Sequence, residues 1–465
     1  MAQVGLHDLW SAGGGAYYGQ DIYATPEQFG AARNGVTDDT AAFNLALLSG
    51  KPVKLLEGTY FLNGPVNWRN YIDMIGAGSM LTTLLINGGV SGIVVNSVSD
   101  CTLEGFRISN VNNMPGGSIG LTITASINIE LKDIRITRQN IGLYASGNSR
   151  LIMDRVFLYA NNLAAYGPYD GEGAAFWSFG VYLNKLFVSG NASGLIANNW
   201  ADVYINDSDF VSNVGMGAAF ESDNVGATYV QDLKITNSLF DSNGNIGLRV
   251  YKRDFVGINN SWVSSGRTAG VSGLFMLACR NVHLNNFQAV NCGLDGMSIQ
   301  TVTPIQFSNV ISKANTRYGC YVELVAGDLV QMSNCDFGGT IVGGLFTQVN
   351  GLVLGGDGGA VHLSNVQALL NSGEQFIASG AVNGIVFDIK SCNFGLPASW
   401  PFFGKNSNSF LISQNRREYF DAAAPGAGTW AVGDRCWKNN PASLGSPGWI
   451  CTTAPLTFSA MANLA

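Results

Sequence analysis

The chain has 465 residues, of which 12% are charged and 59 are glycine, and its formal net charge is −7. The charged fraction is about half of the usual ~25%, and abundant glycine favours short strands joined by tight turns. The acidic balance argues against a nucleic-acid partner, and no run of 18 apolar residues predicts membrane insertion. Residues 1–8 show neither a basic segment nor an apolar core, so no secretory signal is expected.

The first hundred residues divide into two segments. Residues 1–25 contain a triple glycine and several tyrosines, which is typical of a lead-in or attachment segment. Residues 26–100 are expected to form an N-terminal cap and the first strands. The pair Asn34-Gly35 predicts a turn. A helix is predicted from Ala41 to Leu48, ended by Gly50. Its N-cap oxygens would come from Thr37, Asp38 and Asp39, and its apolar face would be formed by Ala42, Leu45, Ala46 and Leu48.

One motif in this region resembles a known family. The stretch FGAARNGVTDDTAAF (29–43), followed by EGTYFL (57–62), is similar to the N-terminal cap of the pectate-lyase-like right-handed parallel β-helix superfamily, in the form found in bacteriophage tailspikes. The motif is typical of the fold and not of an activity, so its two aspartates are interpreted as cap residues. The resemblance implies a homotrimer in the virion tail, assembled in the bacterial host cytoplasm and joined to other phage tail proteins through its N-terminus. It also implies a bacterial surface polysaccharide as the partner.

A short motif then repeats through the middle of the chain. An apolar residue and one spacer precede Asn, Asp or a small residue at Gly105, Asp133, Asp154, Asn184, Asp207, Asn237, Asn260, Asn286, Asn309, Asn334, Asn365 and Ser391. These twelve positions span 286 residues in eleven steps, a mean of 26 residues. A period of 20–50 residues is typical of a stacked repeat. We therefore predict an all-β fold, a single-stranded right-handed parallel β-helix over residues 101–412.

A second asparagine follows five to seven residues after many repeat positions. It is found at Asn140, Asn161, Asn191, Asn213, Asn243, Asn291 and Asn315. Asparagine tolerates the left-handed backbone of tight turns, and its amide can hydrogen-bond to the same residue of the next repeat. We predict that these side chains form a ladder along the solenoid.

Strands with period-2 alternation are predicted after glycines such as Gly142, Gly173, Gly247 and Gly344. Their outward positions form two columns. The first passes through Tyr144, Ala175, Arg249, Tyr321 and Phe346, and the second through Trp177, Glu221, Tyr251, Glu323 and Gln348. Aromatic, amide and charged side chains on one face suit sugar rings, because apolar sugar faces stack on aromatics while hydroxyls meet polar groups. The candidate substrate-binding residues are Trp177, Arg249, Tyr251, Tyr144, Glu323 and Tyr321. The alternative is an aromatic-rich contact between subunits.

The candidate catalytic residues are carboxylates that depart from the repeat. Asp133, Asp154 and Asp207 obey it, so they are interpreted as turn residues. The departures are Glu221 with Asp223, and Asp170 with Glu172 in the aromatic insertion 159–173. Glycoside hydrolysis needs two carboxyl groups about 5–9.5 Å apart. Glu323 is predicted four rungs from Glu221, roughly 19 Å, which is too far for a pair. The alternative for Glu221 is a surface carboxylate paired with Arg249.

The family resemblance does not extend to known catalytic signatures. The Asn-Thr-Asp, Gly-His-Gly and Arg-Ile-Lys signatures of polygalacturonase-like enzymes are missing, as is the aspartate cluster with which pectate lyases hold calcium. Three widely separated histidines argue against a histidine metal site, so no metal and no cofactor is expected. None of the eight cysteines forms a CxxC pair, which favours buried free thiols.

The repeat stops near Gln414, and residues 413–465 are expected to form a small C-terminal β module. The stretches GTWAVGDRCW (428–437) and PGWICT (447–452) resemble the ends of phage tailspikes. A simple β cap, a trimer contact and a glycan contact stay open as its role. The predicted function is a tailspike endoglycosidase that acts on lipopolysaccharide O-antigen or capsule. The alternatives are a non-catalytic receptor-binding β-helix and a polysaccharide lyase or epimerase.

Overall fold

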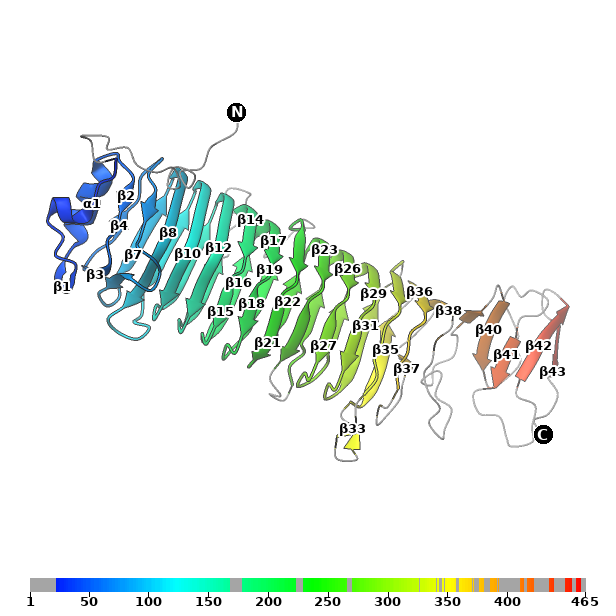
Figure 1. Cartoon of the computed structure of the whole chain (residues 1–465). Coiled ribbons are helices and arrows are strands. Elements are labelled where there is room, and N and C mark those ends of the chain that lie inside the picture. The colour runs from blue at the N-terminus through cyan, green and yellow to red at the C-terminus, as the bar shows by residue number, and fades with distance from the viewer. Residues whose placement is uncertain are drawn as a thin grey trace, which may run out of the picture.

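The computed structural model describes most of the chain up to residue 369 and shorter segments beyond it. The described residues are 22–167, 178–222, 229–265, 270–325, 327–339, 341–342, 345–346, 348–356, 359–369, 371, 376–379, 385–390, 392, 410–413, 416–421, 435–438, 448–453 and 457–460. They form a parallel β-solenoid whose strands stack along one long axis (Figure 1). The predicted all-β parallel β-helix is confirmed.

Two large sheets make up the solenoid. The first, called sheet A, has 28 described strands, and the second, called sheet B, has 13. Sheet B contains β4 (Val66–Asn67), β7 (Ser91–Asn96), β9 (Ile119–Thr124), β11 (Ile141–Ser146), β13 (Leu163–Gly167), β16 (Ser193–Asn198), β19 (Ala218–Glu221), β22 (Leu248–Tyr251), β25 (Leu274–Leu277), β28 (Met297–Gln300), β31 (Tyr318–Leu324), β35 (Asn350–Gly356) and β37 (Phe376–Ser379).

Sheet A has more strands than sheet B because many rungs contribute two strands to it. Early members are β1 (Asn34–Asp38), β2 (Val53–Lys54), β3 (Gly58–Leu62), β5 (Met74–Ile75), β6 (Thr82–Ile86), β8 (Ser99–Asn110), β10 (Ile127–Thr137) and β12 (Ser149–Tyr159). The strand β12 pairs with both β14 (Ser178–Asn184) and β15 (Phe187–Ser189). From this rung to the one formed by β29 (Thr303–Ser308) and β30 (Ile311–Lys313), each rung contributes two strands to sheet A with a bend between them.

The other described strands complete sheet A. They are β17 (Trp200–Asn206), β18 (Asp209–Val211), β20 (Leu233–Thr236), β21 (Leu239–Asn243), β23 (Asp254–Asn259), β24 (Trp262–Ser265), β26 (Arg280–Asn285), β27 (Gln288–Val290), β29 (Thr303–Ser308), β30 (Ile311–Lys313), β32 (Leu329–Ser333), β36 (Gly359–Ser364), β38 (Ile385–Lys390), β39 (Phe410–Ser413), β40 (Arg416–Asp421), β41 (Arg435–Lys438), β42 (Gly448–Thr453) and β43 (Thr457–Ala460). A separate two-stranded sheet joins β33 (Ile341–Val342) to β34 (Leu345–Phe346).

The bend in sheet A is made by the repeated asparagine position. The backbone is left-handed at Asp133, Asp207, Asn237, Asn260, Asn286, Asn309, Asn334 and Asn365. Asn286 Nδ2 donates to Asn260 Oδ1 at 3.0 Å, and Asn365 donates to Asn334 at 2.8 Å. Asparagine and aspartate suit this position because they tolerate a positive φ. The turn role predicted for Asp133 and Asp207 is confirmed, whereas at Asp154 and Asn184 the next residue, Arg155 or Lys185, takes the left-handed position.

The second asparagine ladder lies inside the solenoid. Asn161, Asn191, Asn213 and Asn243 are buried, and each of the first three donates its Nδ2 to the Oδ1 of the next at 2.9–3.2 Å. The prediction is confirmed for these residues and for Asn315, whose Nδ2 donates to Gln348 Oε1.

Two members of the predicted ladder were wrong. In place of Asn140 and Asn291, the ladder positions are held by Gln139 and Cys292, because it is their backbone N–H groups that donate to the next ladder amide.

The N-terminal region contains η2 (Pro26–Phe29) and α1 (Thr40–Leu48). The predicted helix is present, but its buried face is Ala42, Phe43, Ala46 and Leu47. Leu45 and Leu48 are exposed, because the buried face of the helix is rotated relative to the predicted apolar face. No described helix is long and apolar enough to traverse a lipid bilayer.

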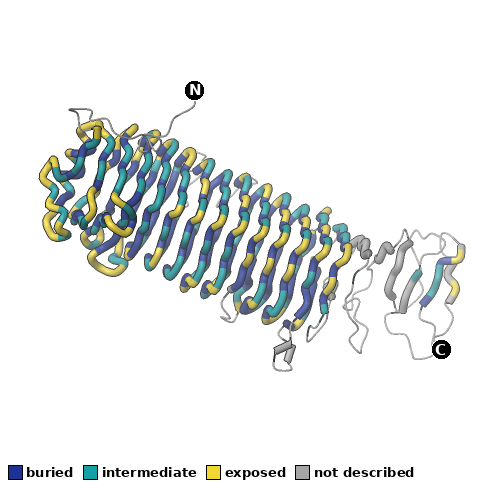
Figure 2. Tube along the Cα trace, viewed as in Figure 1, coloured by how far each residue is buried: buried dark blue, intermediate teal, exposed yellow. Residues whose placement is uncertain are grey.

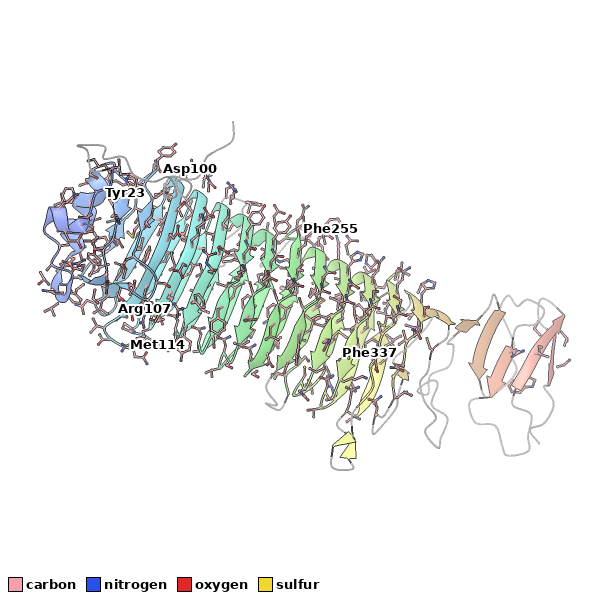
Figure 3. All side chains as sticks on the ribbon, viewed as in Figure 1. Tyr23, Asp100, Arg107, Met114, Phe255 and Phe337 are labelled. Carbon is pink, nitrogen blue, oxygen red and sulfur yellow. The ribbon has the colours of Figure 1, made fainter. Side chains whose placement is uncertain are left out.

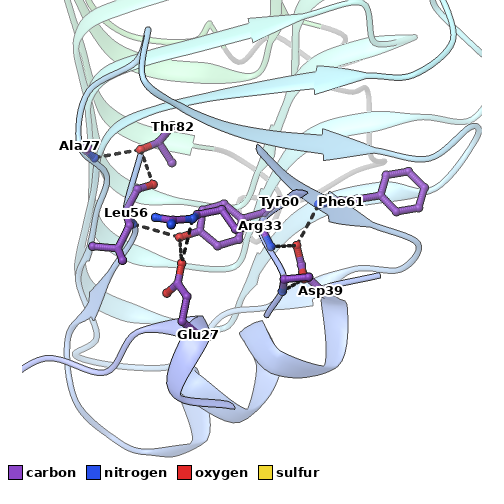
Figure 4. Close-up of polar contacts among 9 residues, drawn as sticks. Glu27, Arg33, Asp39, Leu56, Tyr60, Phe61, Ala77 and Thr82 are labelled. Atoms are coloured by element: carbon purple, nitrogen blue, oxygen red, sulfur yellow. Dashed lines mark hydrogen bonds and ion pairs between the residues drawn. The ribbon is translucent and has the colours of Figure 1, made fainter. Parts of the chain in front are cut away.

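The helix N-cap differs from the prediction as well. Asp39 is the N-cap residue, yet its carboxylate makes no cap hydrogen bond. It is buried and accepts from the backbone N–H groups of Ala32, Arg33 and Phe61 (Figure 4). Beside it, the Tyr60 hydroxyl donates to Glu27 at 2.6 Å. Asp39 therefore links the segment before α1 to β3, which is a structural role.

The interior of the solenoid is apolar. Figure 2 shows buried residues alternating with intermediate or exposed ones along many strands, as expected when successive side chains point to opposite faces. Phe337 is fully buried, whereas Phe255 projects from the surface and is 52% exposed (Figure 3). Seven described cysteines are free thiols, and all of them except Cys392 are buried. Burial raises the pKa of the Cys279 thiol to about 11, so this thiol is chemically quiet at neutral pH.

Candidate functional site

Strand register on the outside of sheet B decides which predicted residues lie together. Tyr144 pairs with Tyr166 on the next rung, and their rings meet edge to face with centroids 6.1 Å apart. Tyr166 thus holds the column position predicted for Ala175, and Val353 holds the position predicted for Phe346. Both predictions failed because these two rungs begin at β13 and β35, and not after Gly173 and Gly344. In the first of them Ala164 takes the place of the expected glycine.

Four of the predicted site residues lie outside the described part of the chain. They are Asp170, Glu172, Trp177 and Asp223. The geometry described below is therefore that of Glu221 and its neighbours.

Glu221 ends β19 and is buried, with 7% of its surface exposed. Its Oε1 lies 3.0 Å from Nε of Arg249, which is one rung further along the solenoid. Phe220 pairs with Val250, so Tyr251 lies one rung from Glu221 in the same column. The Glu221–Arg249 pair was foreseen as the alternative interpretation of Glu221. The burial of its carboxylate was not, and burial strengthens electrostatic interactions because screening by water is lost.

A second arginine lies beneath this pair and was missed by the sequence analysis. Arg253 is fully buried, and its Nη1 donates to the backbone carbonyl of Trp200. Burial lowers the pKa of Arg253 to about 9, while the negative charges of Glu221 and Asp202 act to raise it. Arg253 is therefore still a cation at neutral pH. The sequence carried no direct signal for it, because the register that places Arg253 opposite Val230 is set by the structure.

Two asparagines complete the cluster. Asn198 pairs with Glu221 on the neighbouring rung, and the backbone N–H of Asn199 donates to the Glu221 carbonyl at 2.9 Å. Both side chains are buried. We call Asn198, Asn199, Glu221, Arg249 and Arg253 the Glu221 cluster.

The Glu221 cluster concentrates polar atoms that lack hydrogen bonds. Apart from the atoms of the Glu221–Arg249 ion pair, seven buried side-chain N or O atoms in the described residues have no hydrogen-bond partner, and five of them belong to Asn198, Asn199 and Arg253. Such an atom costs roughly 1–3 kcal/mol, so native proteins rarely keep it without a function. The density of these atoms is a stronger sign of a site than the presence of one acidic residue.

The other predicted binding residues lie away from this cluster. Glu323 follows Glu221 by four rungs in the same column, about 19 Å at the usual strand spacing, as predicted. Tyr144 lies three rungs before Ala219, about 14 Å. Neither residue contributes to the same subsite as Glu221.

Tyr321 and Glu323 belong to a separate group at β31. The Tyr318 and Tyr321 rings lie 6.2 Å apart, and the Arg317 guanidinium sits 4.4 Å from the Tyr318 ring centre. Arg317 also makes two hydrogen bonds of 2.8 and 2.7 Å to the fully buried Asp295. Burial, followed by the charge of Glu323, raises the pKa of the Tyr321 phenol. Because Arg317 is already held by Asp295, this group is a rigid surface feature and not a reactive one.

No cluster of three or more His, Cys, Asp or Glu side chains that could hold a metal ion occurs among the described residues. The chemistry available to the Glu221 cluster is therefore that of one carboxylate, two guanidinium groups and two amides.

Comparisons with known proteins agree on the fold. Residues 27–219 match the family described as rhamnogalacturonase A/epimerase, pectate lyase-like. Tailspike protein 3 of bacteriophage CBA120 is similar in structure, with a TM-score of 0.63 and 16% identity over 95% of this chain and 70% of that chain. The A-module of the mannuronan C-5 epimerase AlgE4 of Azotobacter vinelandii has a TM-score of 0.52 and 13% identity over 78% of this chain and 99% of that chain. No curated protein matches the chain by sequence. The chain is a parallel β-helix protein, and residues 27–219 match the sequence model of that pectate lyase-like family.

Proposed function

We propose that this protein is a phage tailspike that binds and depolymerises a bacterial surface polysaccharide, with the Glu221 cluster as its reactive centre. The observation that carries the proposal is the buried Glu221 carboxylate beside two arginines and several polar atoms without hydrogen bonds. The similarity in fold to a phage tailspike and to an epimerase of a polysaccharide supports the substrate class. A homotrimer attached to the phage tail through the N-terminal segment is part of the same proposal.

The proposed reaction is hydrolysis of a glycosidic bond inside the polymer. Arg249 and Arg253 place two positive charges near Glu221. An ionised carboxylate acts as the general base that activates water or as the nucleophile at the anomeric carbon. The general acid that protonates the leaving oxygen would then be Asp170, Glu172 or Asp223. Tyr251, one rung away, would contact the sugar.

A non-catalytic receptor-binding function is the second candidate, and one observation favours it. The Arg249 guanidinium lies against Glu221 at 3.0 Å, so the carboxylate already has a partner. In this case Glu221 would hold Arg249 in place for binding, and no bond in the polymer would be cleaved.

The test separates these functions by their products. The protein is incubated with purified O-antigen and capsular polysaccharides, while new reducing ends and the ultraviolet absorbance of unsaturated uronic acids are followed. Reducing ends without that absorbance support hydrolysis, and both together indicate a lyase. Retention of the polymer without either product indicates binding alone. If no polymer is cleaved or retained, the proposed function is wrong.

A further inference from the structure

A second polar column runs along the outside of sheet A. His283, Gln306, Gln331 and His362 occupy the same register position on four successive rungs, in β26, β29, β32 and β36. At the usual strand spacing, the column extends about 14 Å from His283 to His362. Gly257 precedes His283 in this register and leaves the column open at that end, because glycine has no side chain. None of these residues belongs to the Glu221 cluster.

A parallel polar column borders the first. It contains Asn285, Ser308, Ser333 and Ser364 on the same four rungs. Between the two columns lies a trough of about 420 Å³, whose floor is the strand backbone at Leu284, Phe307, Met332 and Leu363. We call it the sheet A trough.

Three of the side chains that line the sheet A trough are available to bind a ligand. His283, Gln306 and Gln331 are exposed. Within the described part of the chain these three side chains have no hydrogen bond or ion pair to another residue. Each glutamine offers two donors and one acceptor oxygen, so one rung can contact a ligand that both donates and accepts.

The lining excludes several classes of partner. No Lys, Arg, Asp or Glu lines the trough, which argues against nucleic acid or a charged peptide as the ligand. The three strands β26, β29 and β32 already pair on both sides, so no free edge exists for an added peptide strand. The side chains that line the trough are not among the exposed large hydrophobic residues. Stable subunit interfaces are apolar at their centre, so this lining does not fit such an interface.

A polysaccharide chain satisfies all of these conditions. Its hydroxyls both donate and accept hydrogen bonds, it carries repeated units, and a sugar unit is about as long as one rung. We propose that the sheet A trough binds a stretch of polysaccharide along the solenoid axis, as an anchoring site separate from the Glu221 cluster. The proposal shares its ligand class with the proposed function but does not require that Glu221 cleave anything.

The test is native affinity electrophoresis of the full chain in gels that contain purified O-antigen or capsular polysaccharides. The double variant Gln306→Ala/Gln331→Ala removes two free amides from the trough. We expect it to bind the retarding polymer about tenfold more weakly, because each lost hydrogen bond weakens binding severalfold. The matched control is Gln288→Ala, an exposed glutamine on β27 outside the trough, which should migrate like the wild type.

Two further measurements keep the outcome interpretable. Sedimentation analysis compares the mass of the double variant with that of the wild type, and cleavage of short oligosaccharides reports on the Glu221 cluster. Weaker retention at unchanged mass and unchanged cleavage supports the trough, even if cleavage is absent from both proteins. If the double variant is retained as strongly as the Gln288→Ala variant, the proposed anchoring site is wrong. A change in mass also overturns it and identifies the trough as a contact between copies of the chain. If no polymer retards the wild type, the anchoring site does not exist.

Discussion

The Glu221 cluster and the sheet A trough lie on the same solenoid but use opposite means of presenting polar groups. In the cluster, the Glu221 carboxylate and the Arg253 guanidinium are withdrawn from water, and several polar atoms have no hydrogen-bond partner. In the trough, the amides of Gln306 and Gln331 and the imidazole of His283 stand exposed above a regular strand floor. Buried charge is suited to altering a bond, because its field is poorly screened. Exposed neutral groups are suited to holding a chain without reacting with it.

The rungs explain how one scaffold supports both arrangements. Every rung places one outward side chain at each register position, so a function can extend over many rungs without new backbone geometry. The Glu221 cluster falls where the step between Asp207 and Asn237 is 30 residues, longer than the mean of 26. Additional chain beside a strand can shield charged groups from water. The trough is instead built on the uninterrupted pairing of β26, β29 and β32.

The largest effect is expected from Glu221→Gln. The amide has the same shape but cannot act as a base or nucleophile, so cleavage should fall by roughly 10²–10⁴-fold, the usual contribution of such a group. Reducing-end assays measure the loss, while retention in polysaccharide gels should stay near the wild-type level because the trough is intact. Asp241→Asn, on β21 of sheet A, is the control for removing an acidic residue elsewhere. Full cleavage by the Glu221→Gln variant would refute the assignment of this carboxylate.

Asn213→Ala tests the scaffold that both faces share. Asn213 Oδ1 accepts from the backbone and side chain of Asn191, and its Nδ2 donates to Asn243 and to the Val188 carbonyl. Loss of these buried bonds should lower the free energy of unfolding by about 2–4 kcal/mol, since each unsatisfied group costs roughly 1–3 kcal/mol. Denaturant unfolding measures the change. Cleavage and retention should disappear at the same denaturant concentration, and separate midpoints would show that the two faces unfold independently.

Arg253→Met removes the buried cation while keeping an unbranched side chain of similar length. The variant loses the bond to the Trp200 carbonyl but also loses two buried N–H groups without partners. The free energy of unfolding should therefore change by less than about 1 kcal/mol, or increase. Cleavage should fall about tenfold, because Glu221 loses one of its two nearby cations. Thermal unfolding and initial rates provide the two readouts. A severe loss of stability with normal cleavage would identify Arg253 as a purely structural residue.

Salt provides a smaller and complementary contrast. Between about 0.01 M and 1 M ionic strength the Debye length falls from about 30 Å to about 3 Å. Retention through the uncharged trough should change less than about twofold over this range, and affinity electrophoresis at several NaCl concentrations measures it. A steep decline with salt would mean that charged residues outside the trough hold the polymer.

The smallest effect is expected from Asn286→Ala in the exposed ladder. Its Nδ2 bond to Asn260 lies at the surface, where water can replace it. The unfolding free energy should fall by about 0.5–1 kcal/mol, through the lost bond and the strain of alanine at a positive φ. Thermal unfolding beside the Asn213→Ala variant measures the difference between the exposed and the buried ladder. Equal losses would contradict the distinction between them.

The sequence alone was enough to predict the solenoid, its period and most of the buried asparagine ladder. Each depends on residue type recurring at a fixed interval, as with the left-handed backbone at Asn237 and the buried amide at Asn191. Local rules were less reliable where one residue of register mattered. The helix face was predicted at Leu45 and Leu48, whereas Phe43 and Leu47 are the buried residues. Strand starts were also misplaced at two rungs. At the first of them, Ala164 replaces the glycine on which the prediction relied.

The candidate site shows the same division more sharply. Glu221 could be selected from the sequence because it departs from its column, and Arg249 could be named as its partner by counting one rung. The burial of Glu221, its charge interaction with Arg253 and the two asparagines without side-chain hydrogen bonds depend on how successive rungs pack. The sheet A trough was not foreseen, although His283, Gln306, Gln331 and His362 are plain in the sequence. Periodicity specifies which residues share a column, but the depth of each side chain and the space beside it follow from packing between rungs, which no single repeat contains.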